Sequence, residues 1–244
     1  GHMSAAVWHE LLRQIREARY TGQVGLYLHH EPLLVKSLYE KIREVNETTE
    51  AFVVLSTNGA LLNAANRRLL IEAQPRQVHV NINSAEPSQY ETLMKGLDYT
   101  ETFQNTQSFI EEAAGKIAVE INCPVMDGVD VTSLAKTFPG VTVNGEYWAN
   151  SRGGLLESVS AAGKGSRFKL ETCCVQPTVN FNVLWDGSVI ACCMDWGHES
   201  KPDFPSILEN NMFGTYNNSV MRTLQNEFEG GDYSRYRMCS ACAK

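Results

Sequence analysis

The sequence predicts an α/β protein in which a parallel sheet, flanked by helices, is followed by a small domain made of a β-hairpin and a helix. Short apolar runs alternate with amphipathic helical patterns over about the first 145 residues, and this alternation is typical of βαβ units. The composition changes near residue 146, and six of the seven cysteines lie in the last third of the chain. The second part therefore differs in kind from the first.

In the first part, the predicted helices share apolar residues at helical spacing and cover residues 8–19, 34–46, 63–73, 102–114 and 131–137. The predicted strands are the short apolar runs between them, at residues 24–28, 52–55, 78–82, 117–123 and 141–143. Helices between successive strands imply a parallel sheet, in which chemistry gathers in the loops at the carboxyl ends of the strands. Those loops contain residues 29–32, 56–59, 83–86 and 124–127.

The second part opens with a segment, Glu146 to Gly165, that is rich in Gly, Ser and Ala and is typical of a loop or linker. A β-hairpin is predicted from two strand-like runs, Val179–Leu184 and Val189–Ile190, with Asp186-Gly187 between them. A helix is predicted over Ser219 to Phe228 because its apolar residues fall on one face.

Composition excludes several classes of partner and location. The net charge is −7, and a chain of this sign without Lys/Arg clusters does not suit nucleic acid or an anionic membrane. No apolar run approaches the ~20 residues of a membrane helix, and no signal-peptide pattern is present. We therefore expect a cytoplasmic protein, whose clustered cysteines bind metal rather than form disulfides. The isolated Cys123 is interpreted as a small buried hydrophobe.

The clustered cysteines form three groups: Cys173-Cys174 before the hairpin, Cys192-Cys193 after it, and Cys239-x-x-Cys242 at the end of the chain. Adjacent residues on a strand point to opposite faces, so each doublet should supply one ligand. Four thiolates suit either a tetrahedral zinc ion or a 4Fe–4S cluster. Spacing alone does not decide between the two metals.

The spacing resembles that of the SPASM domain, which holds an auxiliary iron–sulfur cluster. Twelve residues separate Cys174 from Gly187, four separate Gly187 from Cys192, and the Cys239-x-x-Cys242 pair follows. The hairpin from Asn182 onward, the later Phe213-Gly214 and the helix after it are also similar to that family. The resemblance implies an auxiliary 4Fe–4S cluster with Cys174, Cys192, Cys239 and Cys242 as its ligands, with zinc as the alternative metal.

The first part resembles the later strands of the radical S-adenosylmethionine (SAM) barrel. His30-Glu31-Pro32 is similar to the family's Gly-Glu-Pro motif, and Ser56-Thr57-Asn58-Gly59 to its Ser-Thr-Asn-Gly segment. The resemblance places Glu31 at the SAM ammonium and Ser56, Thr57 and Asn58 at the SAM carboxylate and ribose. It also places Asn83 in the cofactor loop, although the family usually has Ser and Asp near it, and Arg152 beside the SAM carboxylate.

Two domains follow from these resemblances: a partial (β/α) barrel at residues 4–155 and a SPASM-like domain at residues 156–244. The family's C-x-x-x-C-x-x-C loop has no counterpart, because no cysteine precedes Cys123. We therefore expect SAM chemistry only in a complete protein that supplies this loop. The barrel lacks its first strand, so the edge of residues 24–28 should be covered by the N-terminal segment or by a partner.

The resemblance implies two functions. The first is a radical SAM oxidoreductase or maturase that modifies a peptide or another natural-product precursor oxidatively, provided that the cluster loop exists outside this sequence. The second is a non-catalytic partner, recognition or electron-transfer protein that keeps only the auxiliary cluster. Expected partners are a peptide or small-molecule substrate and, through the barrel edge, a homo- or hetero-oligomer. A zinc-stapled scaffold is a third interpretation, and no residue is assigned a catalytic role.

Overall fold

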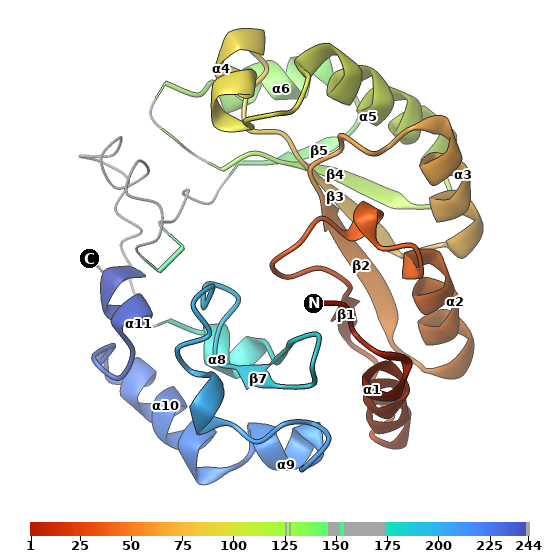
Figure 1. The fold of residues 1–244 in the computed structure, drawn as a ribbon. Helices are drawn as coiled ribbons and strands as arrows, with labels where there is room; N and C mark the ends of the chain where they lie inside the picture. The colour runs from red at the N-terminus through yellow and green to blue at the C-terminus, as the bar shows by residue number, and fades with distance from the viewer. Residues whose placement is uncertain (125, 127, 146–151, 154–173, 243–244) are drawn as a thin grey trace. The chain divides into compact units, whose positions relative to one another are not determined.

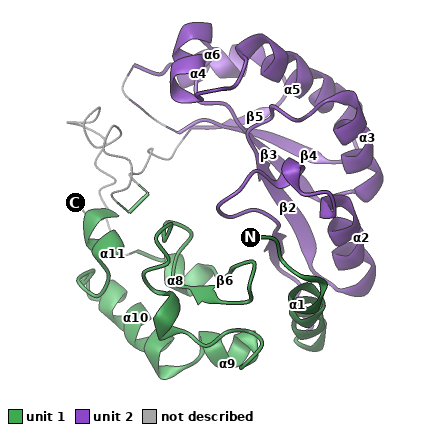
Figure 2. Cartoon of the chain, in the orientation of Figure 1, with its two compact units in different colours: residues 1–18, 149–244 green, residues 19–148 purple. Residues whose placement is uncertain are grey.

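The structure is a computed structural model, and it describes residues 1–124, 126, 128–145, 152–153 and 174–242 of the 244. The chain forms two compact units, shown in Figure 2. Unit 1 combines residues 1–18 with 149–244, and unit 2 spans residues 19–148. The predicted domain boundary after residue 155 lies outside the described residues and stays a prediction, as does most of the predicted linker.

Unit 2 contains a parallel sheet whose strands follow the order β1-β2-β3-β4-β5 (Figure 1). The strands are β1 (Gln23–Gly25), β2 (Phe52–Thr57), β3 (Gln77–Asn81), β4 (Ala118–Asn122) and β5 (Thr142–Asn144). The helices between them are η1 (Pro32–Leu34), α2 (Leu38–Thr48), α3 (Ala64–Ala73), α4 (Pro87–Leu93), α5 (Tyr99–Ala113) and α6 (Val131–Thr137). The predicted α/β class and parallel sheet are confirmed.

Helices cover one face of this sheet, as α2, α3 and α5 do in Figure 1. The side chains on that face are apolar and buried; Val53, Leu55, Val78 and Val80 are at most 1% exposed. Gly59 follows β2 at a φ of +80°, and a Cβ at that position would lie 2.9 Å from Val80. The loop after β2 can therefore approach the next strand only because this residue is glycine.

The opposite face of the sheet carries polar side chains. Residues alternate between faces along a strand, so Ser56, His79 and Glu120, which are register neighbours across β2, β3 and β4, share this face. Asn81 and Asn122 are register neighbours one step nearer the carboxyl ends of the same strands. Polar groups thus gather toward the end of the sheet where parallel folds place their chemistry.

The free edge of β1 is not paired with any strand in the described part of the chain. Gln23 and Gly25 are exposed there, and the hydroxyl of Tyr20 donates to the carbonyl of Gln23 at 3.2 Å. We expected the N-terminal segment or a partner to cover this edge. The Tyr20 side chain thus reaches part of the edge, and the covering of the rest by the N-terminal segment or by a partner stays a prediction.

Unit 1 contains short elements around one apolar cluster. They are α1 (Ala5–Glu17), α8 (Gln176–Val179), β6 (Asn182–Val183), β7 (Val189–Ile190), η2 (Lys201–Asp203), α9 (Met212–Tyr216), α10 (Ser219–Glu229) and α11 (Arg237–Cys242). The cluster is formed by buried side chains, including Val7, Val189, Cys192, Ile207, Met221, Leu224 and Phe228. The predicted hairpin and the predicted helix of this region are both present.

The hairpin differs from its prediction at one end. Val179, predicted as the start of the first strand, ends the short helix α8, because Pro177 suits a first helical turn and the backbone N–H of Val179 donates to the carbonyl of Val175. The antiparallel pairing begins at Asn182, opposite Ile190. Gly187 makes the turn at a φ of +85°, as expected for the last residue of a three-residue hairpin loop.

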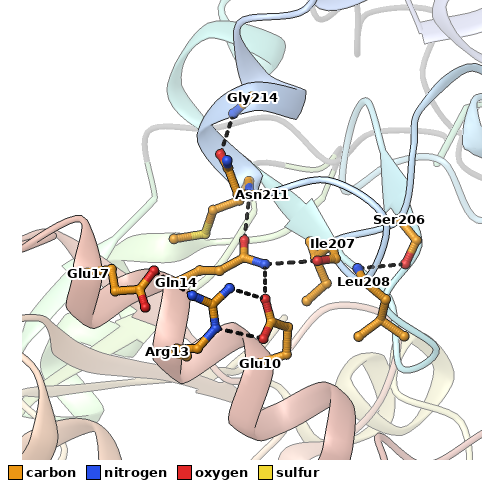
Figure 3. Close-up of polar contacts among 10 residues, drawn as sticks. Glu10, Arg13, Gln14, Glu17, Ser206, Ile207, Leu208, Asn211 and Gly214 are labelled. Carbon is orange, nitrogen blue, oxygen red and sulfur yellow. Dashed lines mark hydrogen bonds and ion pairs between the residues drawn. The ribbon is translucent and has the colours of Figure 1, made fainter.

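Helix α1 belongs to unit 1, although the sequence suggested that it accompanies the sheet. Figure 3 shows how Gln14, which is only 3% exposed, joins α1 to this unit. Its Nε2 donates to the carbonyl of Ile207 at 2.8 Å, and its Oε1 accepts the N–H of Met212 at 2.7 Å.

The described helices include none with the length and apolar character of a membrane span.

Candidate cofactor and metal sites

The loops after β1 and β2 meet through the carboxylate of Glu31. Its Oε1 accepts the Thr57 hydroxyl at 2.6 Å and the N–H of Leu33 at 3.1 Å, while its Oε2 accepts the N–H of Asn58 at 2.9 Å. The structure thus brings together three residues that the sequence placed in one cofactor site. Both carboxylate oxygens already accept hydrogen bonds, so Glu31 shapes the loop that carries Thr57 and Asn58.

The remaining predicted cofactor residues of unit 2 lie at neighbouring strand ends. Ser56 accepts a hydrogen bond from Nδ2 of Asn81 at 2.9 Å, which links β2 to β3. Asn83 lies just beyond β3, and its Nδ2 donates to the Met94 sulfur at 3.2 Å. The carboxyl ends of β1, β2 and β3 therefore present one continuous polar edge.

Sequence reasoning missed a side-chain pair, His79 and Glu120, on the polar face of the sheet. Nδ1 of His79 lies 3.3 Å from Oε2 of Glu120, and the two residues are register neighbours on β3 and β4. The signal was the alternation of polar His79 with buried Val78 and Val80, which marks a strand with one polar face.

Arg152 lies in unit 1, where its guanidinium carbon is 4.4 Å from the centre of the Trp196 ring. Its backbone has a φ of +48°, and Gly153 after it has a φ of +65°. A Cβ on Gly153 would lie 2.8 Å from Cβ of Met238. This tight, left-handed turn packs beside Met238 on α11, and the role of Arg152 at SAM stays a prediction.

The four cysteines predicted as metal ligands all lie in unit 1. Cys192 is part of the apolar cluster at 8% exposure, and Cys174 and Cys239 pack against that cluster. Cys239 and Cys242 are three residues apart on α11, a spacing that places two side chains on one face of a helix. Cysteines from before the hairpin, after the hairpin and α11 thus lie in one region of this unit.

Hydrogen bonds and pKa shifts show which groups surround these cysteines. The N–H of Cys174 donates to Oη of Tyr233 at 3.2 Å, and the N–H of Met194 donates to Sγ of Cys192 at 3.3 Å. Burial raises the pKa of the Cys239 thiol to about 12, with the neighbouring Cys174 and Cys242 as further causes. Burial likewise raises the pKa of Cys242, and its thiol neighbours include Cys174.

In the second doublet, the thiols of Cys192 and Cys193 both lie close to the other clustered cysteines. The hydrogen bond between the two side chains raises the pKa of Cys192 and lowers that of Cys193, and burial adds to the rise at Cys192. The Cys193 sulfur also lies 3.9 Å from Oε1 of Gln176. The structure therefore supplies a fifth thiol next to the four predicted ligands.

The donor set fits a cationic, sulfur-binding centre. Thiolates this close raise one another's pKa, so the ionised set is stable only around a compensating positive charge. Among the described residues, no three His, Cys, Asp or Glu side chains are gathered tightly enough to hold a single ion.

Cys123 lies apart from this set, in unit 2. It is fully buried just after β4, and burial raises the pKa of its thiol to about 11. A thiol of this kind is unreactive and behaves as a small apolar side chain. The interpretation of Cys123 as a core residue agrees with this position.

The family comparison concerns the region of these cysteines. Residues 173–243 match the SPASM family model, which is described as an iron-sulfur cluster-binding domain. No curated protein matched the chain.

Solved structures match nearly the whole chain at low sequence identity. A crystal structure of BtrN in complex with AdoMet and 2-DOIA has a TM-score of 0.68 at 17% identity, covering 100% of this chain and 81% of that one. The structure of anSMEcpe with bound AdoMet has a TM-score of 0.64 at 16% identity, covering 100% and 76%. SuiB from Streptococcus suis, bound to S-adenosylmethionine, has a TM-score of 0.60 at 12% identity, covering 91% and 60%.

The similar structures are radical SAM enzymes. The chain has their α/β fold, and residues 173–243 match the SPASM family model. The predicted fold class and the resemblance to radical SAM enzymes with a SPASM domain are thereby confirmed, whereas the individual cofactor and metal residues stay predictions.

Proposed function

We propose that this chain is part of a radical SAM/SPASM-type oxidoreductase that modifies a peptide or another natural-product precursor. The observation that carries the proposal is the convergence of Cys174, Cys192, Cys239 and Cys242 in unit 1. These four residues would hold an auxiliary 4Fe–4S cluster, which supplies one-electron chemistry when bound. One of the similar structures, anSMEcpe, contains AdoMet together with a peptide, which supports a peptide as one substrate class.

In this proposal each unit has a distinct task. Unit 2 would bind SAM at the polar edge where Glu31 holds Thr57 and Asn58 in place. The hydroxyl and amide groups of these two residues suit the carboxylate and ribose of the cofactor. Unit 1 would hold the four thiolates in a partly buried setting, which limits the access of water and oxidants to the ligands.

The metal and acid-labile sulfide content of anaerobically purified protein tests this proposal. We expect about four irons and about four sulfides per chain. Replacing Cys174 by alanine should remove most of the iron, whereas Cys123→Ala, which removes a buried thiol from unit 2, should leave the iron content unchanged. About one zinc per chain without sulfide would contradict the proposal.

The Cys192-Cys193 doublet is resolved by the same measurement. Cys192→Ala should lower the iron content, and Cys193→Ala should retain it, because the C-x12-G-x4-C spacing ends at Cys192. The reverse pattern would show that Cys193 is the ligand.

A further inference from the structure

A short loop after Cys192 carries a buried carboxylate, Asp195, that holds the loop to the hairpin. Asp195 is 1% exposed, and its Oδ1 accepts the N–H of Glu199 at 2.7 Å. Its Oδ2 accepts the N–H of Ser200 at 2.9 Å and the Ser200 hydroxyl at 2.6 Å. The Ser200 hydroxyl oxygen accepts the N–H of Ala191 at 2.9 Å, directly before Cys192. A buried acidic side chain thus fixes the loop to the end of β7.

Glu199 extends this connection to α11. Its Oε1 accepts the N–H of Arg237 at 2.7 Å, and its Oε2 accepts the N–H of Met238 at 3.1 Å. These are the first two backbone donors of α11, and donors at a helix start have no partner within the helix. Glu199 therefore fixes the start of the helix on which Cys239 and Cys242 lie.

The Glu199 carboxylate also lies close to a predicted ligand. It accepts the N–H of Met238, the residue directly before Cys239, at 3.1 Å. Its negative charge is therefore within electrostatic reach of a cluster held by Cys239. A cluster gains negative charge on reduction, so a nearby carboxylate disfavours the reduced form.

We propose that Glu199 is a positioning residue for the auxiliary cluster, which joins the Cys192 segment to the Cys239-x-x-Cys242 helix and lowers the reduction potential of the cluster by its charge. The inference rests on the proposed function, because it requires a bound cluster. Positioning and charge are separable, since glutamine keeps one hydrogen-bond acceptor and loses the charge, whereas alanine loses both.

Three variants of the full chain test the inference, measured anaerobically beside the wild type. Glu199→Gln should retain iron and sulfide and raise the midpoint potential in an EPR-monitored redox titration. Glu199→Ala should lose iron to a chelator ~10-fold faster, the scale at which supporting contacts around metal sites act. Glu229→Gln, which removes an exposed carboxylate from α10, is the charge-matched control and should change neither quantity.

The inference would be overturned if Glu199→Gln kept the wild-type potential or if Glu199→Ala kept the wild-type rate of iron loss. Far-UV circular dichroism of each variant before loading separates a folding defect from a local effect. The iron and sulfide content of the wild type, determined first, tests the proposed function separately. A wild type without a cluster contradicts that function, whereas a loaded wild type with unaffected Glu199 variants contradicts only the positioning role.

Discussion

At the residue scale, one residue, Tyr233, connects two of the segments that carry cysteines. Oη of Tyr233 accepts the N–H of Cys174 at 3.2 Å, and the carbonyl of Tyr233 accepts the hydroxyl of Ser240 on α11 at 2.9 Å. Tyr233→Phe keeps the ring packed on Phe228 but removes the acceptor for Cys174. A typical hydrogen bond contributes about 1 kcal/mol to stability. We therefore expect Tyr233→Phe to lose iron to a chelator several-fold faster than the wild type, and visible absorbance measures this rate.

A matched control for this prediction exists in unit 2. The hydroxyl of Tyr99 donates to the carbonyl of Ala85 at 2.8 Å, so Tyr99→Phe removes a hydrogen bond of the same kind far along the chain from any clustered cysteine. Its rate of iron loss should equal that of the wild type. Equal rates in Tyr233→Phe and Tyr99→Phe would contradict a role for Tyr233 at the site.

At the element scale, α1 depends on one buried amide for its place in unit 1. Gln14→Leu retains bulk but leaves the carbonyl of Ile207 and the N–H of Met212 without these partners. An unsatisfied buried polar group costs ~1–3 kcal/mol, so the free energy of unfolding should fall by about 2 kcal/mol or more in a urea titration. Gln107→Leu, on an exposed position of α5, should stay within about 0.5 kcal/mol of the wild type.

An unchanged midpoint in Gln14→Leu would show that α1 contributes little to the stability of unit 1. The apolar residues of α1 would then have to hold the helix in unit 1 by themselves, since Val7 belongs to the buried cluster and Leu11 packs against it.

At the scale of the whole molecule, the two units differ in what holds them together. Unit 2 has a continuous parallel sheet with a buried apolar layer. Unit 1 has a two-stranded hairpin and short helices around a smaller cluster, and such small cores commonly depend on bound metal for stability. Removing the metal with a chelator should therefore accelerate amide hydrogen exchange in β7, α10 and α11 and leave β2 to β4 unchanged. Mass spectrometry of peptic fragments measures the exchange rates of both units. Uniform acceleration across the chain would contradict the prediction.

Local signals account for most of what could be predicted about the fold. The strand residues of β2 and β3 and the helix residues of α5 and α6 carry clear periodicity, and their predicted positions agree with the structure to within a few residues. Helix α4 was not predicted, because its sequence, Pro-Ser-Gln-Tyr-Glu-Thr-Leu, contains only Tyr90 and Leu93 as large apolar residues. Its start is set by Glu86, whose carboxylate accepts the N–H groups of Ser88 and Gln89.

The candidate metal site was predictable from residue type and spacing, whereas its supporting contacts were not. The four cysteines were predicted as ligands because their C-x12-G-x4-C and C-x-x-C spacing resembles that of the SPASM domain. Glu199, Asp195 and Tyr233 give no such signal, since carboxylates and tyrosines are common throughout the chain. Their importance appears only when their hydrogen-bond partners are known.

The sequence by itself determined the alternation of strands and helices and the hairpin turn at Gly187, because each depends on neighbouring residues. Only the tertiary structure decided that α1 joins unit 1 and that Glu31 bridges two loops of unit 2. It alone also decided that Glu199 reaches the helix of Cys239 and Cys242. These contacts join residues distant in sequence, and whether a polar side chain finds such a partner depends on packing that no local pattern encodes.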